Sequence, residues 1–229
     1  MDNITIIGIG HKARQGKDVL ATGLQASLKE KNKESFILHF ADPLKEEVSS
    51  KTDIPLIFKR HANGKNYYFL RDNQNTYKMF TSEEMPNLHT MFEDRQINEY
   101  FHMKEKDPTL LQIWGTDFRR NIDKYYWINA LKPAIINIAH SLNGNKGYII
   151  IPDVRFINET EFIKDVNGVF IRIMRMNEDG TIFTDNARSA KHNSETELDG
   201  YKADYTVIAN SGDLKKIRKE ADIIINKLL

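Results

Sequence analysis

The residues from Gly10 to Asp18 have the types and spacing needed to bind a phosphate group. They read Gly-His-Lys-Ala-Arg-Gln-Gly-Lys-Asp and follow a short apolar, β-branched segment, Ile4 to Ile9. Glycines let backbone N–H groups turn inward around phosphate oxygens, and the start of a following helix adds the positive end of its dipole. Lys17 could then reach the β- and γ-phosphates of a nucleotide. The segment therefore predicts a phosphate-binding loop between a strand and a helix.

This loop departs from the usual pattern in two places. Five residues separate Gly10 from Gly16 where the pattern has four, and Asp18 stands where Ser or Thr usually helps to hold Mg²⁺. A carboxylate can also ligate Mg²⁺, directly or through water, so Asp18 is a candidate ligand. A dinucleotide-binding loop fits less well, because Ala13 replaces its third glycine and Lys17 would have no role. The plainer alternative is a strand-to-helix turn with solvated basic side chains.

A second group of candidate residues follows Leu110. On an α-helix Gln112, Thr116 and Arg119 stand at i, i+4 and i+7, so we expect them to share one face, opposite Trp114. Arg119 and Arg120 could bind a phosphate, since a guanidinium matches it in a bidentate fork. The alternative is a surface helix in which Asp117 and Asp123 pair with Arg120.

A third group follows the apolar segment Gly147 to Ile151. Asp153 and Arg155 come at its end, and ligands bind at the carboxyl ends of strands in open parallel sheets. Asp153 could hold Mg²⁺ through a water molecule. Alternatively, Asp153 caps a turn and Arg155 pairs with it.

The polar segment after residue 174 carries further basic side chains. Arg175, Arg188 and Lys191 precede the sequence His192-Asn193-Ser194-Glu195. We expect a mobile lid over about residues 176–197 that closes over phosphates and excludes water. A solvated surface loop is the alternative. Further on, Ser211 is the expected N-cap of the last helix, and the turn at Asn210 could contact an adenine edge.

Short strands alternating with amphipathic helices must position these groups, which predicts a parallel sheet in a three-layer α/β fold. Strands are expected at about 4–9, 35–40, 147–151, 169–174 and 205–209, and helices at about 16–31, 44–50, 108–121, 125–142, 157–166 and 214–228. Residues 51–106 are polar and rich in turn signals, so they predict an inserted lobe with a hairpin near Asn63-Gly64. The 229 residues are expected to form one domain, residues 1–229, with this lobe and the lid.

Composition excludes several kinds of protein. The chain has no Cys, which rules out disulfides, thiol catalysis and cysteine-ligated zinc, and its seven His are scattered. The formal net charge is +1, which argues against a protein that coats nucleic acid or an anionic membrane. The N-terminus lacks the basic and apolar regions of a signal peptide, so we expect a cytoplasmic protein. A homodimer is left open.

Taken together, these motifs resemble the deoxynucleoside monophosphate kinases of tailed bacteriophages, in the P-loop kinase superfamily. Asp18 after the lysine looks like this family's habit. The residues that carry the resemblance are Gly10 to Asp18, Phe40-Ala41-Asp42-Pro43-Leu44-Lys45, Leu111-Gln112, Gly115-Thr116-Asp117, Arg119-Arg120, Asp153 to Glu159 and His192 to Glu195.

The resemblance implies transfer of the γ-phosphoryl group of ATP, with Mg²⁺, to a deoxynucleoside monophosphate, in the host cytoplasm if the chain is phage-encoded. It implies a P-loop kinase core, an acceptor-binding lobe and a lid. The implied catalytic residues are Lys17, Arg155, Arg175 and Asp42. The implied ATP-binding residues are Gly10, Arg14, Gly16, Lys17, Asp18, Val19 and Asn210. The implied acceptor-binding residues are Asp42, Gln112, Thr116, Arg119, Arg120, Asp153, Arg155 and Glu195, and the implied Mg²⁺ ligands are Asp18 and Asp153.

Two alternatives remain open from the sequence. One is a kinase of the same superfamily with another phosphorylated acceptor, such as dephospho-coenzyme A or phosphomevalonate. The other is a nucleotide-binding module that transfers nothing. The number of arginines beyond the phosphate loop favours an enzyme, because a sensor needs only one phosphate site.

Overall fold

The computed structural model of the chain describes residues 3–10, 12–51, 56–62, 65–71, 77–81, 111–185 and 192–229. It contains two compact units. The first unit is Met1–Phe40 with Leu131–Leu229, and the second unit is Ala41–Ala130. The boundary falls within helix α5 (Tyr126–Ser141), which begins in the second unit and ends in the first.

The first unit is built on a five-stranded sheet in the order β2-β6-β1-β7-β8. Every neighbouring pair is parallel, which confirms the predicted α/β fold with a parallel sheet. Strand β1 lies at the centre, where Ile7 is opposite Ile150 of β6 and Val169 of β7. The strands are β1 (Ile4–Gly10), β2 (Glu34–Ile37), β6 (Gly147–Val154), β7 (Val169–Met176) and β8 (Tyr205–Asn210).

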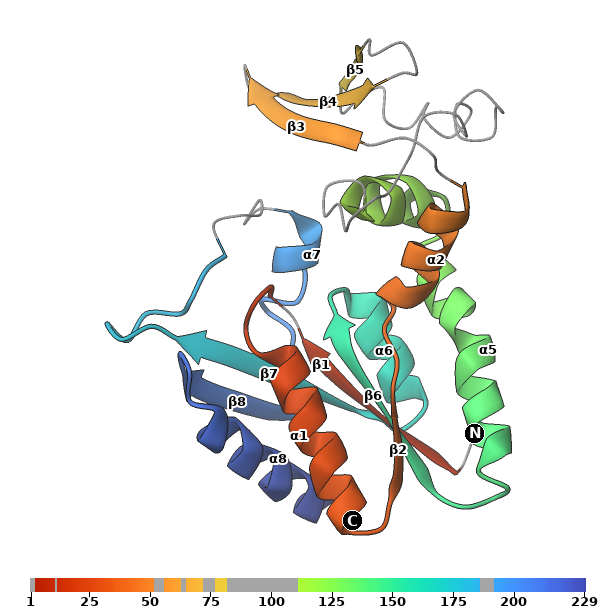
Figure 1. The fold of residues 1–229 in the computed structure, drawn as a ribbon, viewed down its shortest axis with the longest axis vertical. Coiled ribbons are helices and arrows are strands. Elements are labelled where there is room, and N and C mark those ends of the chain that lie inside the picture. Colours follow the sequence, from red (N-terminus) through yellow and green to blue (C-terminus); the bar gives the residue numbers. More distant parts are fainter. Residues whose placement is uncertain are drawn as a thin grey trace. The chain divides into compact units, whose positions relative to one another are not determined.

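Helices cover both faces of this sheet and complete the three layers (Figure 1). Helices α1 (Lys17–Glu30) and α8 (Leu214–Leu228) lie side by side over one face, where Ile7 and Ile9 join their buried core cluster. Helix α6 (Ile157–Asp165) covers the opposite face, since a Cβ atom at Gly8 would lie 2.4 Å from Ile163 of α6. Alternate residues of β1 therefore pack against different helices, as the two-residue period of a strand requires.

The parallel arrangement brings the carboxyl ends of all five strands to one edge. The phosphate-loop residues follow β1, Phe40 follows β2, Asp153 lies near the end of β6, and Asn210 ends β8. This is the edge at which ligands bind in open α/β sheets.

The second unit contains helix α2 (Ala41–Lys51), a three-stranded sheet and the π-helix η2 (Ile113–Arg120). The strands β3 (Leu56–Ala62), β4 (Lys65–Arg71) and β5 (Tyr77–Thr81) pair antiparallel in sequence order. Ala62 is opposite Lys65, so β3 and β4 pair on either side of the predicted turn. Asn63 and Gly64 themselves lie outside the described residues, as does the stretch from 82 to 110.

Several predicted boundaries differ from those observed. Strand β6 continues through Pro152 to Val154, whereas the sequence predicted its end at Ile151. Gly8 pairs with Ile151 but Gly10 pairs with Val154, so the register shifts at this proline. Proline has no N–H for the ladder, and such a bulge re-aims the neighbouring side chains.

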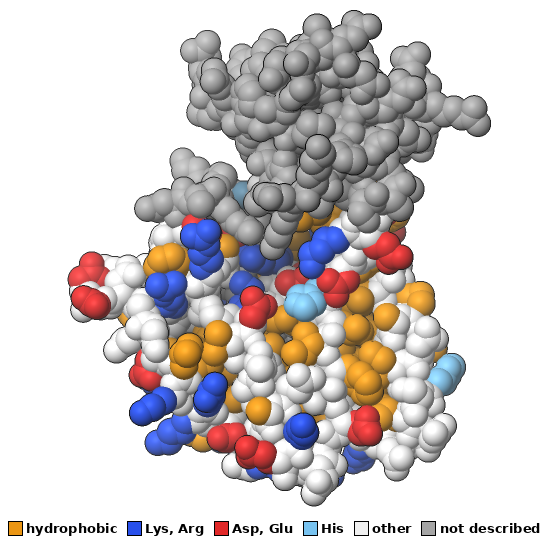
Figure 2. All heavy atoms as spheres, viewed as in Figure 1, with side chains coloured by type: hydrophobic (Ala, Val, Ile, Leu, Met, Phe, Trp, Pro, Cys, Tyr) orange, Lys and Arg blue, Asp and Glu red, His pale blue; other side chains and the backbone are white. Residues whose placement is uncertain are grey.

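The described surface is of mixed charge. In Figure 2, which shows one face, Lys and Arg side chains lie among Asp and Glu side chains and form no single continuous basic area. No described helix is long and apolar enough to cross a membrane.

Candidate active site

The loop after β1 makes a tight turn into the start of α1. Its backbone has left-handed φ angles at Arg14 (54°) and Gly16 (96°). Gly16 is the N-cap of α1 and brings no side-chain hydrogen bond to the helix. The first N–H groups of a helix have no partner within it, and here no capping side chain replaces one. Phosphate oxygens are the natural acceptors for such groups at the positive end of a helix.

Lys17, the first residue of α1, is buried with its ammonium group turned back into this loop. Its Nζ donates to the carbonyl oxygen of Lys12. Burial, and then the positive charge of Arg155, lower the pKa of Lys17 from 10.5 to about 7. The carboxylates of Glu195, Asp18 and Asp153 raise this pKa by smaller amounts. The lysine is therefore held close to several charged groups at the carboxyl edge of the sheet and, without an anion, is only half protonated near neutral pH.

The two glycines of β1 are required by packing. A Cβ atom at Gly10 would lie 2.7 Å from the Phe170 ring and 3.0 Å from the carbonyl oxygen of Val154. Gly10 lies within the strand and pairs with β6 and β7. His11, the next residue of the motif, lies outside the described residues.

Among the other predicted ATP-binding residues, Asp18 is exposed in the first turn of α1, and Val19 packs against the core. Arg14 is also exposed, with its Nε 3.4 Å from Asp185 Oδ2. Asn210 is the exposed last residue of β8. Arg14, Asp18 and Asn210 are therefore exposed, whereas Ala13, Gln15 and Lys17 are buried.

The end of β6 supplies the predicted acidic and basic pair. Asp153 is half-buried, and its Oδ1 accepts the N–H of Phe40 at 2.9 Å. Arg155 pairs with Glu195, its Nη1 lying 2.7 Å from Oε1. A carboxylate at the end of β6 and a guanidinium just beyond it are thus both close enough to Lys17 to affect its pKa.

Glu195 makes a second contact, with the phosphate loop itself. It lies on the short helix α7 (Asn193–Thr196), in a stretch that the sequence predicted to be loop-like. Its Oε2 accepts the N–H of Ala13 at 2.8 Å. These two contacts tie α7 to the phosphate loop and to the end of β6.

Arg175 extends from β7 at the same edge. Its Nε donates to Ser211 Oγ at 2.8 Å, and its guanidinium lies 4.1 Å from the centre of the Phe183 ring. The prediction that Ser211 caps the last helix was wrong. Asp213 is the N-cap, because its side chain accepts the N–H of Lys216, while Ser211 donates its hydroxyl to the carbonyl oxygen of Met176.

Part of the predicted lid is described. Residues 177–185 leave β7 through a turn at Gly180 and come back beside it, where the N–H of Phe183 donates to the carbonyl oxygen of Arg175 at 2.8 Å. The side chain of Gln15 donates to the carbonyl oxygen of Phe183 at 2.8 Å, which ties this return to the phosphate loop. Arg188 and Lys191 lie outside the described residues.

The predicted acceptor-binding residues Asp42, Gln112, Thr116, Arg119 and Arg120 belong to the second unit. Asp42 is exposed in the first turn of α2 and accepts from Lys45 Nζ at 3.1 Å. Gln112 Nε2 is buried and has no hydrogen-bond partner among the described residues. Arg120 Nη1 donates to the carbonyl oxygen of Lys124 at 3.3 Å.

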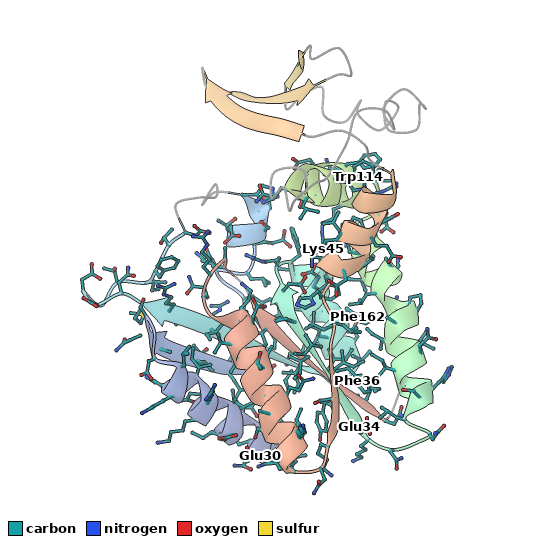
Figure 3. All side chains as sticks on the ribbon, viewed as in Figure 1. Glu30, Glu34, Phe36, Lys45, Trp114 and Phe162 are labelled. Carbon is teal, nitrogen blue, oxygen red and sulfur yellow. The ribbon has the colours of Figure 1, made fainter. Side chains whose placement is uncertain are left out.

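The prediction that Arg119 lies on the helix face opposite Trp114 was wrong. Trp114 Nε1 (Trp114 is labelled in Figure 3) and Arg119 Nε both donate to Glu47 Oε1, at 3.0 and 2.6 Å. Arg119 therefore lies on the same side as Trp114, not opposite. The prediction assumed an α-helix with 3.6 residues per turn. The segment η2 is instead a π-helix, whose i→i+5 hydrogen bonds give a wider turn and bring residues 114 and 119 to the same side.

Glu47 was not predicted from the sequence. It also accepts the hydroxyl of Tyr126 at 2.7 Å. Burial raises the pKa of Glu47, but hydrogen bonds from Tyr126, Arg119 and Trp114 outweigh burial and leave the pKa below its ordinary value. No signal in the sequence marks this cluster, because its members are far apart along the chain.

Three other positioning side chains were missed in the first unit. Buried Gln15 accepts the N–H of Arg175 at 2.7 Å. Arg172 donates to the carbonyl oxygens of Leu198, Asp199 and Tyr201. Glu159 accepts the N–H groups of Arg155 and Phe156, at 2.7 and 3.1 Å. Only the last had a sequence signal, since a glutamate three residues after a helix start is typical of a capping box.

Comparison with known proteins agrees with this geometry. No curated protein matches the chain. Residues 57–221 match the family described as deoxynucleotide monophosphate kinase, which is more than two thirds of the chain. The match includes the stretch from 57 to 106 that no sequence motif explained, and it begins after the loop that joins β1 to α1. The chain belongs to the deoxynucleotide monophosphate kinase family.

Proposed function

We propose that the protein transfers the γ-phosphoryl group of ATP to a deoxynucleoside monophosphate, giving ADP and a deoxynucleoside diphosphate. The observation that carries this proposal is the buried Lys17 ammonium, turned into a glycine-containing loop in front of a helix that has no side-chain cap. An ammonium group and unpaired helix N–H groups together favour a polyphosphate. Family membership makes a kinase the natural use of such a site.

In this proposal the loop binds the ATP phosphates through the backbone between Gly10 and Gly16 and through the first turn of α1, Lys17 to Val19. Arg14 and Asn210 border the nucleotide. Lys17 neutralises charge between the β- and γ-phosphates, where it builds up during transfer. Binding of a phosphate anion beside Lys17 would also restore its full protonation, because an opposite charge favours the charged form.

Asp18 and Asp153 fit a bound Mg²⁺. Mg²⁺ prefers oxygen ligands and is commonly held by one or two carboxylates together with substrate phosphates and water. Both carboxylates act on the pKa of Lys17, so both lie near the phosphate loop. No group of three acidic or histidine side chains that could hold a metal occurs in the described part of the chain, which matches a metal shared with the substrate. When bound, Mg²⁺ would supply further neutralisation of the phosphate charge.

The acceptor is itself a phosphate dianion, so two negative groups must be brought together. Lys17, Arg155 and Arg175 supply positive charge at the edge of the first sheet. The attacking phosphate oxygen is already ionised, so no general base is required. Phosphoryl transfer depends mainly on positioning and charge neutralisation, which are what these residues offer.

We assign the acceptor to the second unit, with Asp42, Gln112, Thr116 and Arg120 as binding residues. Gln112 has the firmest support, because its buried amide, which has no partner among the described residues, would gain a hydrogen bond from a ligand. Arg119 has the weakest support, because Glu47 already takes its Nε. We propose residues 51–106 as an acceptor-binding lobe and residues 176–197 as a lid.

The test is release of ADP from ATP and Mg²⁺ in the presence of each deoxynucleoside and ribonucleoside monophosphate, with dephospho-coenzyme A and phosphomevalonate in parallel. We expect ADP release with at least one deoxynucleoside monophosphate, and loss of several orders of magnitude in turnover in Lys17→Ala. Release only with another acceptor, or with none, would reject the proposal.

A further inference from the structure

Glu195 touches both the phosphate loop and Arg155. Its side chain is only 8 % exposed. One carboxylate oxygen accepts the N–H of Ala13 at 2.8 Å and the other accepts Arg155 Nη1 at 2.7 Å. A single carboxylate therefore joins two segments that come from different strands, the loop after β1 and the end of β6.

The helix that carries Glu195 is short but firmly held. At its start, His192 Nδ1 accepts the N–H of Ser194 at 3.1 Å. Two residues beyond Glu195, Glu197 accepts the N–H of Ile157 at 2.9 Å. The guanidinium of Arg172 then binds three carbonyl oxygens within the turn of residues 198–201. The position of Glu195 is thus set by hydrogen bonds on both sides of it, which a residue that merely fills space does not need.

The contacts of Glu195 fit a positioning role better than direct contact with substrate. Both of its oxygens already accept hydrogen bonds from groups of the site. A carboxylate facing a phosphate would repel it, whereas a carboxylate behind a guanidinium fixes that guanidinium and leaves the net charge of the pair near zero. Arg155 has a long side chain with many rotamers, and its bonds to the carboxylate of Glu195 and to the carbonyl oxygen of Ser194, 2.7 and 3.3 Å from Nη1, favour one of them before substrate binds.

We propose that Glu195 is a positioning residue for phosphoryl transfer, which holds Arg155 and the phosphate loop in a fixed relation and does not itself bind substrate. This inference rests on the proposed function for its kinetic part. It replaces the expectation from sequence that Glu195 contacts the acceptor.

The test separates the two contacts of the carboxylate. Glu195→Gln keeps an oxygen that can accept from Ala13 but loses the charge that pairs with Arg155, and Glu195→Ala loses both contacts. Glu197→Gln is the matched control, because Glu197 lies beside the same short helix and accepts a backbone N–H, that of Ile157, but makes no hydrogen bond with Arg155 or with the described residues of the loop. Thermal unfolding of each variant checks its fold.

We expect Glu195→Gln to lower kcat/KM for the acceptor about tenfold. In a protein that already carries Arg155→Ala, the same substitution should change kcat/KM less than twofold, because the effects of substitutions at residues that act as a unit do not add. We expect Glu195→Ala to raise the Kd for ATP about fivefold, with Glu195→Gln and Glu197→Gln within twofold of the unchanged protein. The Kd is measured by calorimetry and needs no turnover, so this arm remains readable if the protein transfers no phosphate and the proposed function fails.

Two results would overturn the inference. Equal losses from Glu195→Gln in the presence and absence of Arg155 would mean that Glu195 acts on substrate independently. An ATP Kd in Glu195→Ala equal to that of Glu197→Gln would mean that the contact with Ala13 does not organise the loop. If Glu195→Ala does not fold, the same comparison of Glu195→Gln in the two Arg155 backgrounds decides.

Discussion

Lys17 gives a prediction that distinguishes a buried phosphate-binding lysine from a solvated one. A solvated lysine keeps its charge to about pH 10, whereas Lys17 has a pKa of about 7 in the free protein. Only about one molecule in a hundred then carries the charged form at pH 9. If binding requires that form, the apparent Kd for a polyphosphate rises about tenfold for each pH unit above 8. Proton uptake should accompany binding in this range.

The assay is calorimetric titration with ATP from pH 7.5 to 9.5, in buffer that contains a chelator so that Asp18 and Asp153 have no metal to bind. The phosphates of ATP are fully ionised above pH 7.5, so the ligand itself contributes no change. Lys17→Arg is the control, since a guanidinium keeps its charge throughout and should give a flat profile. A Kd for the unchanged protein that varies less than threefold over this range would refute the reasoning.

The same pKa predicts how the free protein's stability depends on pH. The pKa of Lys17 is lower in the folded state than its unfolded value of 10.5, so between pH 7 and 10.5 the unfolded state binds more protons and stability rises with pH. From pH 7 to pH 9 the gain is on the order of 2 kcal/mol. The measurement compares how the free energy of unfolding changes with pH in the unchanged protein and in Lys17→Met. Met has no titratable group, so the difference between the two gives the contribution of Lys17.

The remaining predictions concern the second unit, the acceptor site and the lid. Hydrogen bonds lower the pKa of Glu47 in the folded state, so the stability it contributes is present above its unfolded pKa and is lost as pH falls through the folded pKa. Glu47→Gln should lower the free energy of unfolding at pH 7 by about 1–3 kcal/mol and weaken its decrease at acidic pH, as measured by denaturant unfolding. The same decrease at acidic pH in the variant and the unchanged protein would contradict this. Arg155→Lys should fail to restore turnover lost in Arg155→Ala, since an ammonium cannot reproduce the planar fork, and full rescue in steady-state kinetics would argue against bidentate binding. A bisubstrate analogue that joins adenosine to a deoxynucleoside should protect residues 177–195 from protease, and equal cleavage with and without it would reject the lid.

Much of the fold follows from local patterns in the sequence. Five apolar, β-branched segments alternate with amphipathic helices, and each became a strand of the parallel sheet. The loop was predictable because its function depends on adjacent residues, with Gly16 and Lys17 at the start of a helix. The predicted end of β6 was wrong because proline usually ends a strand, whereas here the pairing of β1 with β6 shifts register at Pro152 and the strand continues.

Interactions across long sequence distances could not be predicted in the same way. Glu47 gathers Trp114, Arg119 and Tyr126 from two later helices, and nothing near residue 47 indicates it. The π-helical repeat of η2 also has no local signal, so a 3.6-residue period placed Arg119 on the wrong side. Glu195 likewise joins Ala13 and Arg155, which lie far from it along the chain.

The most direct measurement of the central claim is transfer of the labelled γ-phosphate of ATP to a deoxynucleoside monophosphate, with the product separated and identified. The account predicts that the label appears in a deoxynucleoside diphosphate, in proportion to the ADP formed, and that Lys17→Met abolishes this product while its thermal unfolding remains cooperative. Label recovered only as inorganic phosphate, or only on a different acceptor, would contradict it.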